Sequence, residues 1–267
     1  MSNYWAEREA KHIEEMLKRH VNYEQEIHRR YLQLWKTIEA EIQQFYVAYA
    51  GKEKISIDEA KRRASKHDVQ IFAEKAKRYV QARDFSKEAN EQLRLYNLTM
   101  KVNRLELLKS KIGLYLTDNT NQLQTYFTAI LTEEAVAEFV RQAGILGGSV
   151  LSEETYRLFA KAIIDGSFHN ATFSQRLWVN QDVLKASIDR LLTVGLSAGK
   201  HPDVLARELR KLVVIDSLRG KETADYVARR LMISESARIQ SEVQKQSYEK
   251  YGYEEYNLIV EPSACPI

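Results

Sequence analysis

The chain has 267 residues, of which 44% are apolar and 29% charged, with only three prolines and ten glycines. So few helix-breaking residues favour long helices over a many-turned β architecture, and the sequence predicts a mainly α fold. No run approaches the ~18 apolar residues of a membrane span, and the charged N-terminus is unlike a signal peptide, so no membrane partner is expected. The single cysteine excludes an intrachain disulfide framework and a cysteine-rich zinc site.

The net charge of +3 is unevenly distributed. Residues 52–111 hold sixteen basic and nine acidic side chains, a net charge of +7. Such an excess can neutralise DNA phosphates, although exposed helix faces are often equally charged. The candidate contacts to double-stranded DNA are Arg62, Arg63, Lys75, Lys77 and Arg78.

Residues 4–50 predict one long helical rod, because nothing in this range breaks a helix. Its apolar positions, spaced by three or four residues, are Ile27, Tyr31, Leu34, Ile38, Ile42, Phe45 and Tyr49. At 1.5 Å per residue, about 45 residues make a rod of roughly 68 Å. A helix of this length is typical of a packing strut or an assembly arm.

His12, His20 and His28 recur every eight residues along this rod. Eight residues turn a helix by about 800°, or about 80° net, so the histidines drift off one face. They cannot hold one metal ion together within the helix. We expect them to be surface residues.

The rest of the N-terminal region should be helical as well. Gly51 ends the rod, residues 56–59 form a capping box, and a long segment begins at Ser86. Polar residues 117–120 are expected to interrupt that segment, which resumes until Gly144.

Glycines at 147 and 148 mark the expected hinge and domain boundary. The sequence therefore divides into a long-helix region at 1–146, a compact helical domain at 147–220 and a C-terminal helix with a short strand at 221–267.

The compact domain contains shorter helices with recognisable ends. Ser152 should cap one that ends at residues 165–166, and Thr172 or Ser174 should cap the next. Residues 195–199 read as a loop, and Pro202 suits the first position of the helix that follows.

The C-terminal stretch carries the most unusual residue of the chain. Glu235 lies in the middle of the apolar face of a helix, where an unpaired charge would cost several kcal/mol. Arg238, one turn further on, is the expected partner, although an arginine of another helix would also serve. We favour a structural role for this acid over a general base or metal ligand. Gly252 should cap the helix, and residues 256–260 alternate like a strand.

The same stretch resembles a known signature. Residues 229–237 read RRLMISESA and are followed by Tyr248, Gly252, Tyr256 and Cys265-Pro266. This order resembles the minor head proteins of tailed phages, the head morphogenesis proteins of the Mu F-like type. The signature residues are Arg230, Glu235, Arg238, Tyr248, Gly252 and Cys265.

The chain departs from this family in two places. Ser234 stands where the family usually has threonine, a change that keeps the hydroxyl group. The family also usually carries a second cysteine three positions after the first, whereas this sequence stops at Ile267, so we expect either that the chain is trimmed or that the cysteine-containing tail is missing.

The resemblance implies a structural protein of the virion, not an enzyme, and no cofactor. It implies contact with the portal protein, and with scaffolding or major capsid protein as further partners, in head assembly or genome delivery. The protein would lie in the head interior at the portal vertex, after assembly in the host cytoplasm. The alternatives are a helical module that binds packaged DNA and the non-catalytic front end of a longer phage enzyme or toxin. Self-association is open as well.

Overall fold

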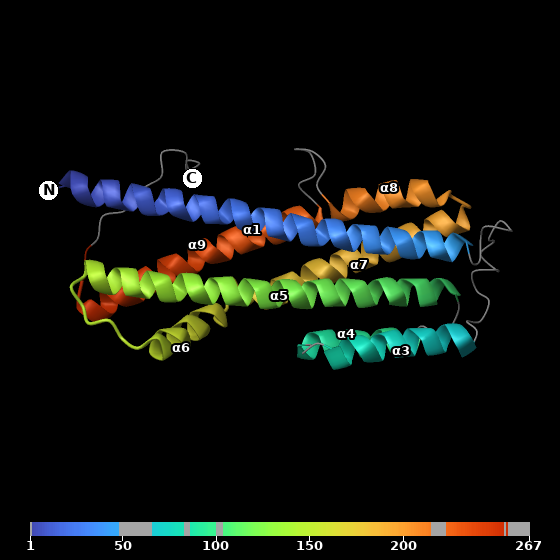
Figure 1. Cartoon of the computed structure of the whole chain (residues 1–267), viewed down its shortest axis with the longest axis horizontal. Helices are drawn as coiled ribbons and strands as arrows, with labels where there is room; N and C mark the ends of the chain where they lie inside the picture. Colours follow the sequence, from blue (N-terminus) through green and yellow to red (C-terminus); the bar gives the residue numbers. More distant parts are fainter. Residues whose placement is uncertain are drawn as a thin grey trace. The chain divides into compact units, whose positions relative to one another are not determined.

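The computed structural model describes residues 2–47, 66–82, 86–99, 104–214, 223–253 and 255. Within these ranges the chain is helical and contains no β-strand beyond an isolated bridge between Phe168 and Ala171 (Figure 1). The mainly α fold is confirmed. The expected strand at 256–260 lies outside the described residues.

The helices follow one another along the chain with short connections in the second half. Their bounds are α1 Ser2–Phe45, α3 Lys66–Ala82, α4 Lys87–Thr99, α5 Arg104–Ile145, α6 Glu153–Ile164, α7 Phe173–Ser197, α8 Pro202–Val213 and α9 Ala224–Tyr251. The expected long N-terminal helix is present as α1, and the signature segment at 229–237 lies within α9.

The residues group by packing into two units. Unit 1 draws on 1–25, 128–166 and 232–267, and unit 2 on 26–127 and 167–231. Helices α1, α5 and α9 therefore each contribute residues to both units. The sequence suggested consecutive domains at 1–146, 147–220 and 221–267 instead, and those boundaries stay a prediction. The glycines at 147 and 148 lie in the connection between α5 and α6, which both contribute to unit 1.

The core of unit 1 forms between α5, α6 and α9. Phe139 of α5 stacks on Tyr156 of α6 with ring centroids 5.3 Å apart. Gly148 lies against the ring of Tyr251, so closely that a Cβ at this position would be 2.1 Å from Tyr251 Cε1. The other buried apolar side chains here include Leu131, Ala135, Ala143, Ile163, Ile164, Met232, Ile239 and Val243.

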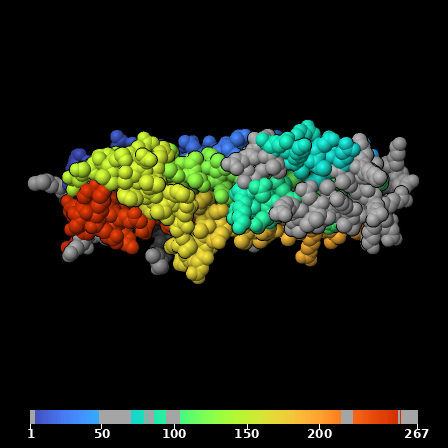
Figure 2. All heavy atoms as spheres, turned by 90° about the horizontal axis from the view of Figure 1, so that it is seen from below, coloured from blue at the N-terminus to red at the C-terminus, as the bar shows by residue number. Residues whose placement is uncertain are grey.

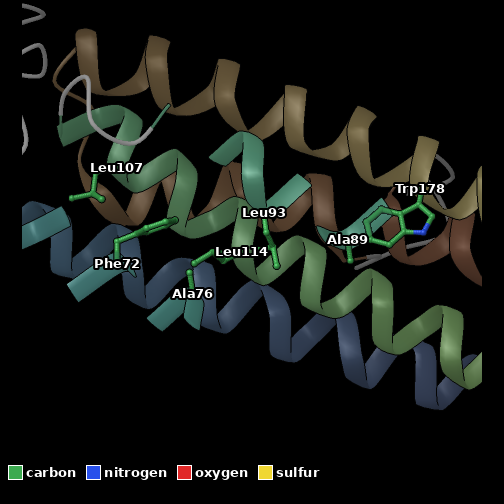
Figure 3. Close-up of a cluster of buried hydrophobic side chains, with 7 residues drawn as sticks. All are labelled: Phe72, Ala76, Ala89, Leu93, Leu107, Leu114 and Trp178. Atoms are coloured by element: carbon green, nitrogen blue, oxygen red, sulfur yellow. The ribbon is translucent and has the colours of Figure 1, made fainter. Parts of the chain in front are cut away.

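The core of unit 2 contains the apolar stripe of α1. The predicted positions Ile27, Tyr31, Leu34, Ile38, Ile42 and Phe45 are all buried. A second cluster joins α3, α4, α5 and α7, and Figure 3 shows its members Phe72, Ala76, Ala89, Leu93, Leu107, Leu114 and Trp178. Helices α3 and α4 lie on an outer surface of this unit (Figure 2).

Three predicted helix ends are confirmed. Ser152 caps α6 by accepting a hydrogen bond from the backbone N–H of Thr155. Thr172 caps α7 in a capping box with Gln175, and Pro202 occupies the first turn of α8. These ends were predictable because each depends on residues close together in the sequence.

The expected interruption at 117–120 is wrong, since α5 runs through it. Two contacts accommodate polar side chains here. Asp118 accepts a hydrogen bond from Gln122 one turn further along α5, and the neighbouring Asn121 accepts one from the backbone N–H of Ser86. Asp118 and Asn121 therefore do not compete with the helix for its backbone groups.

The expected loop at 195–199 is also wrong over most of its length, because α7 continues to Ser197. Gly195 lies inside the helix and faces Leu205 of α8. A Cβ at Gly195 would lie 2.2 Å from Leu205 Cδ2. This glycine therefore serves the close approach of two helices and does not form a turn.

Candidate functional site

The signature glutamate is buried and paired, as the sequence predicts. Glu235 is 1% exposed, and Arg238 Nε donates to its Oε2 at 2.7 Å. Arg238 Nη1 and Nη2 also donate to the backbone oxygen of Ile163, each at 3.3 Å. Ile163 lies in the last turn of α6, where a positive charge is favourable, and its carbonyl also accepts the backbone N–H of Gly166 at 3.2 Å. The pair therefore joins α9 to the end of α6.

The neighbouring residue Ser236 belongs to a second buried group. Its Oγ donates to Glu134 Oε2 of α5 at 2.6 Å, and the hydroxyl of Tyr23 donates to Glu134 Oε1 at 2.8 Å. His20 Nε2 lies 3.1 Å from Ser236 Oγ, and Arg19 Nε lies 3.7 Å from Glu134 Oε1. This group connects α1, α5 and α9 within unit 1.

Serine, histidine and glutamate together suggest a nucleophile, but the protons are placed otherwise. In a catalytic triad the histidine accepts the serine proton and the acid orients the histidine. Here the Ser236 hydroxyl donates its hydrogen bond to Glu134. The Nε2–H of His20 must therefore donate to the Ser236 oxygen. Burial lowers the pKa of His20 despite the opposing charge of Glu134, which favours the neutral ring at neutral pH. The group links three helices, and its serine hydroxyl donates to the acid where a triad serine would donate to the histidine.

A third buried group lies one turn further along α5. Arg141 donates to both oxygens of Glu138 at 2.7 Å and to Glu9 Oε2 of α1 at 2.7 Å. Gln142 and Gln244 each donate to Glu138 Oε1. Burial alone would raise the pKa of Glu138, but the hydrogen bonds and charge of Arg141 outweigh it and hold the pKa below its usual value. Glu138 is therefore a carboxylate tied to both α5 and α9.

The surface placement expected for the histidines is wrong for His20, which is 6% exposed. His12 is half-buried, with Nε2 3.5 Å from Glu138 Oε2. His28 Nδ1 lies 2.6 Å from Asp225 Oδ2, in unit 2. The eight-residue spacing does turn them off one face, but α1 is covered on more than one side.

Asp225 is a buried acid that sequence reasoning missed. It is fully buried in the first turn of α9 and lies 3.0 Å from Arg229 Nε as well as close to His28. The sequence signal that could have located this helix start, and the acid in its first turn, is Thr223. Its hydroxyl accepts a hydrogen bond from the backbone N–H of Tyr226, as a helix N-cap does.

Glu41 of unit 2 was also missed, because its partners come from other helices. Lys75 Nζ donates to Glu41 Oε1 at 3.0 Å, and the hydroxyl of Tyr115 donates to the same oxygen at 2.5 Å. Lys111 Nζ lies 3.4 Å from Glu41 Oε2. These contacts leave the pKa of Glu41 lowered although its burial raises it. A pocket of about 130 Å³ lies beside this group, lined in part by Phe45, Arg104 and Leu107.

The candidate DNA contacts are placed unequally. Lys75 is engaged with Glu41 and Tyr115, whereas Lys77 and Arg78 of α3 are exposed. Arg62 and Arg63 lie outside the described residues. Of the five candidates, the described residues therefore leave Lys77 and Arg78 exposed.

The other signature residues lie at different depths. Arg230 is exposed, with its guanidinium 5.8 Å from the ring centroid of Tyr226. Tyr248 is half-buried, and its backbone oxygen accepts the N–H of Tyr253. Gly252 ends α9 with φ +75°, the left-handed conformation of a C-terminal cap, as predicted. Cys265 lies outside the described residues.

No protein-family model matches the chain, and neither does a curated protein or a solved structure. Within the described residues, no three histidine, cysteine or acidic side chains are arranged to hold a metal ion. None of the described helices combines the length and apolar character of a membrane span.

Proposed function

We propose that this protein is a structural component of a tailed-phage head, a minor head protein that associates with the portal. One observation supports this proposal above the others. Two polar residues of the signature segment, Glu235 and Ser236, lie in the interior of unit 1 and bond to groups that join helices. Buried polar residues that hold helices together suit a role in assembly more than a role in turnover.

The proposed site of action is the portal vertex, in the head interior, with assembly in the host cytoplasm. The portal protein is the main partner, and scaffolding and major capsid proteins are secondary partners. Long helices with charged outer faces suit a protein that takes part of its stability from neighbouring subunits. The contribution is to head assembly or genome delivery, without a cofactor.

Co-sedimentation with the portal ring tests this proposal. The full chain is mixed with purified portal rings of its phage and separated on a density gradient, with major capsid protein as a parallel partner. We expect the chain to move to the portal fractions. A chain that stays at the top of the gradient with every head protein contradicts the proposal.

A pair of variants separates assembly from folding. Arg230→Ala changes an exposed signature residue, whereas Glu235→Gln changes a buried one. We expect Arg230→Ala to keep the unfolding midpoint but weaken portal binding, and Glu235→Gln to lower the midpoint. Normal portal binding by a folded Arg230→Ala protein would remove Arg230 from the interface.

Binding to packaged DNA is the second candidate, because Lys77 and Arg78 are adjacent and exposed on α3. Affinity for duplex DNA is measured at two salt concentrations, since phosphate contacts release counterions and make binding salt-dependent. Lys77→Glu with Arg78→Glu should weaken binding, while Lys211→Glu, on α8, serves as a charge-matched control. A flat salt dependence would exclude this mode of binding.

A further inference from the structure

Helix α7 of unit 2 carries a second apolar face that points to solvent. The exposed fractions of Val179, Val183 and Val194 are 59%, 63% and 56%. Ala186 and Arg190 are exposed between them. The spacings of four, three, four and four residues place all five side chains within a stripe about 80° wide.

The opposite face of α7 already packs inside unit 2 through Leu177, Leu184, Ile188 and Leu192. The outward stripe is therefore not needed to hold this helix in place. Valine is also a poorer helix former than alanine or leucine, because its branched side chain loses rotamer freedom in a helix. A surface that covers the three exposed valines would remove their apolar area from water, which is favourable.

We infer that a second copy of this chain covers the stripe, with the two α7 helices antiparallel and a two-fold axis passing Ala186. In this register, positions whose numbers add up to about 372 lie at the same height along the pair, so Val179 lies close to Val194 of the other copy. Ala186 meets its own copy on the axis. A methyl side chain at the crossing lets two helix backbones approach closely, while valines on both sides fill the contact.

Charge complementarity selects this orientation. Asp182 is exposed beside Val183, and its Oδ1 accepts a hydrogen bond from Gln92 of α4 at 3.0 Å. An antiparallel pairing centred on Ala186 brings Asp182 of each copy opposite Arg190 of the other. A parallel pairing in register would place Arg190 against Arg190 and Asp182 against Asp182. Opposite charges therefore meet twice in the antiparallel pair, and like charges meet in the parallel one.

Disulfide trapping of the full chain tests the register, in a Cys265→Ser background that removes the only natural cysteine. Ala186→Cys should form a covalent dimer under mild oxidation, because a disulfide needs Cα atoms within about 7 Å. Val179→Cys alone should not, but a mixture of Val179→Cys and Val194→Cys should give a cross-linked pair. Lys211→Cys on α8 is the exposed control.

Each cross-linking outcome either supports or contradicts the antiparallel pairing. Dimers from Ala186→Cys and from the mixture support the antiparallel register. Dimers from Val179→Cys alone would show a parallel pairing and overturn it. An Ala186→Cys protein that cross-links no faster than Lys211→Cys would overturn self-pairing along α7.

Sedimentation equilibrium tests the charge argument without cysteines. Arg190→Glu should weaken the dimer by about tenfold or more, because it places acids opposite one another. Adding Asp182→Arg restores opposite charges and should restore most of the affinity. A monomeric natural chain, or an equal dimer in all three proteins, contradicts the inference. Portal co-sedimentation is a separate measurement, so this inference and the proposed function can fail independently.

Discussion

Ser236 on α9 donates its hydroxyl proton to Glu134 on α5 across 2.6 Å, and this bond fixes the role of the histidine beside it. Because the serine hydroxyl already donates to the acid, His20 acts as the hydrogen-bond donor to the serine oxygen. Both members of the bond are buried, so each depends on the other for its hydrogen bonding.

Ser236→Ala should therefore destabilise the protein by about 1–3 kcal/mol, the usual cost of leaving buried polar partners unsatisfied. The free energy of unfolding in urea measures this. Ser241→Ala is the matched control, since Ser241 is exposed on the same helix and should change stability by less than about 0.5 kcal/mol. Equal losses in the two variants would refute the importance of the Ser236 bond.

Arg238→Met should lower the free energy of unfolding by about 3–5 kcal/mol, because it removes the guanidinium that pairs with the buried Glu235 carboxylate. Chemical unfolding with circular dichroism gives the value. Combining Arg238→Met with Glu235→Leu removes both charges and should recover much of the loss. A double variant as unstable as Arg238→Met alone would show that lost packing, not the lost ion pair, causes the effect.

Mild acid should loosen unit 1. Burial lowers the pKa of His20, and the charge of Arg19 lowers it further, whereas Glu134 and Glu24 raise it. The uncharged groups that face the ring are those of Tyr23 and Ser236. The pKa of His12 is lowered by burial and Arg141, against Glu138 and Glu9. As pH falls below the ordinary value of 6.5, the unfolded chain binds protons before the folded one does. Stability should be constant above this pH and decrease below it.

Urea midpoints between pH 8 and pH 5.5 check this expectation. His20→Gln retains a side-chain N–H donor but does not titrate, so its midpoint should fall less across that range than the midpoint of the natural chain. Because the pKa of Glu138 is lowered from its ordinary value of 4.5, its effect on stability appears only below pH 4.5 and does not contribute between pH 8 and pH 5.5. Identical pH profiles for the two proteins would exclude His20 as a source.

Gly195→Ala and Gly144→Ala should change stability in opposite directions, although both glycines lie in helices. A Cβ at Gly144 meets nothing within 4 Å, so alanine should stabilise by about 0.5–1 kcal/mol. At Gly195 the same atom would collide with the buried Leu205 side chain and should destabilise. Thermal unfolding measures both effects. Adding Leu205→Ala to Gly195→Ala tests the clash, since its cost should then be smaller than in the natural background.

Sequence patterns predicted the features that depend on neighbouring residues. The apolar stripe of α1, the Thr172 cap and the Glu235–Arg238 pair each involve positions within a few turns of one another. Periodicity and capping chemistry are visible at that range. They also indicated correctly that Glu235 would be buried.

The errors concern residues whose environment comes from distant parts of the chain. His20 looked exposed because its partners Ser236 and Glu134 are 216 and 114 positions away, and Gly195 looked like a turn because Leu205 is not visible in its local pattern. Residues 117–120 looked like a break because they are polar, and the contact of the adjacent Asn121 with the backbone of Ser86 is not visible in the local pattern. Local rules cannot supply such contacts.

The three helices that contribute to both units determine how the chain can be dissected. Unit 1 is assembled from segments at the start, middle and end of the chain. Any contiguous fragment that contains all of unit 1 therefore contains unit 2 as well. Deleting either terminus removes part of this assembly and would abolish activities that the deleted residues do not carry. Binding surfaces on this protein should therefore be mapped with surface point substitutions in the intact chain.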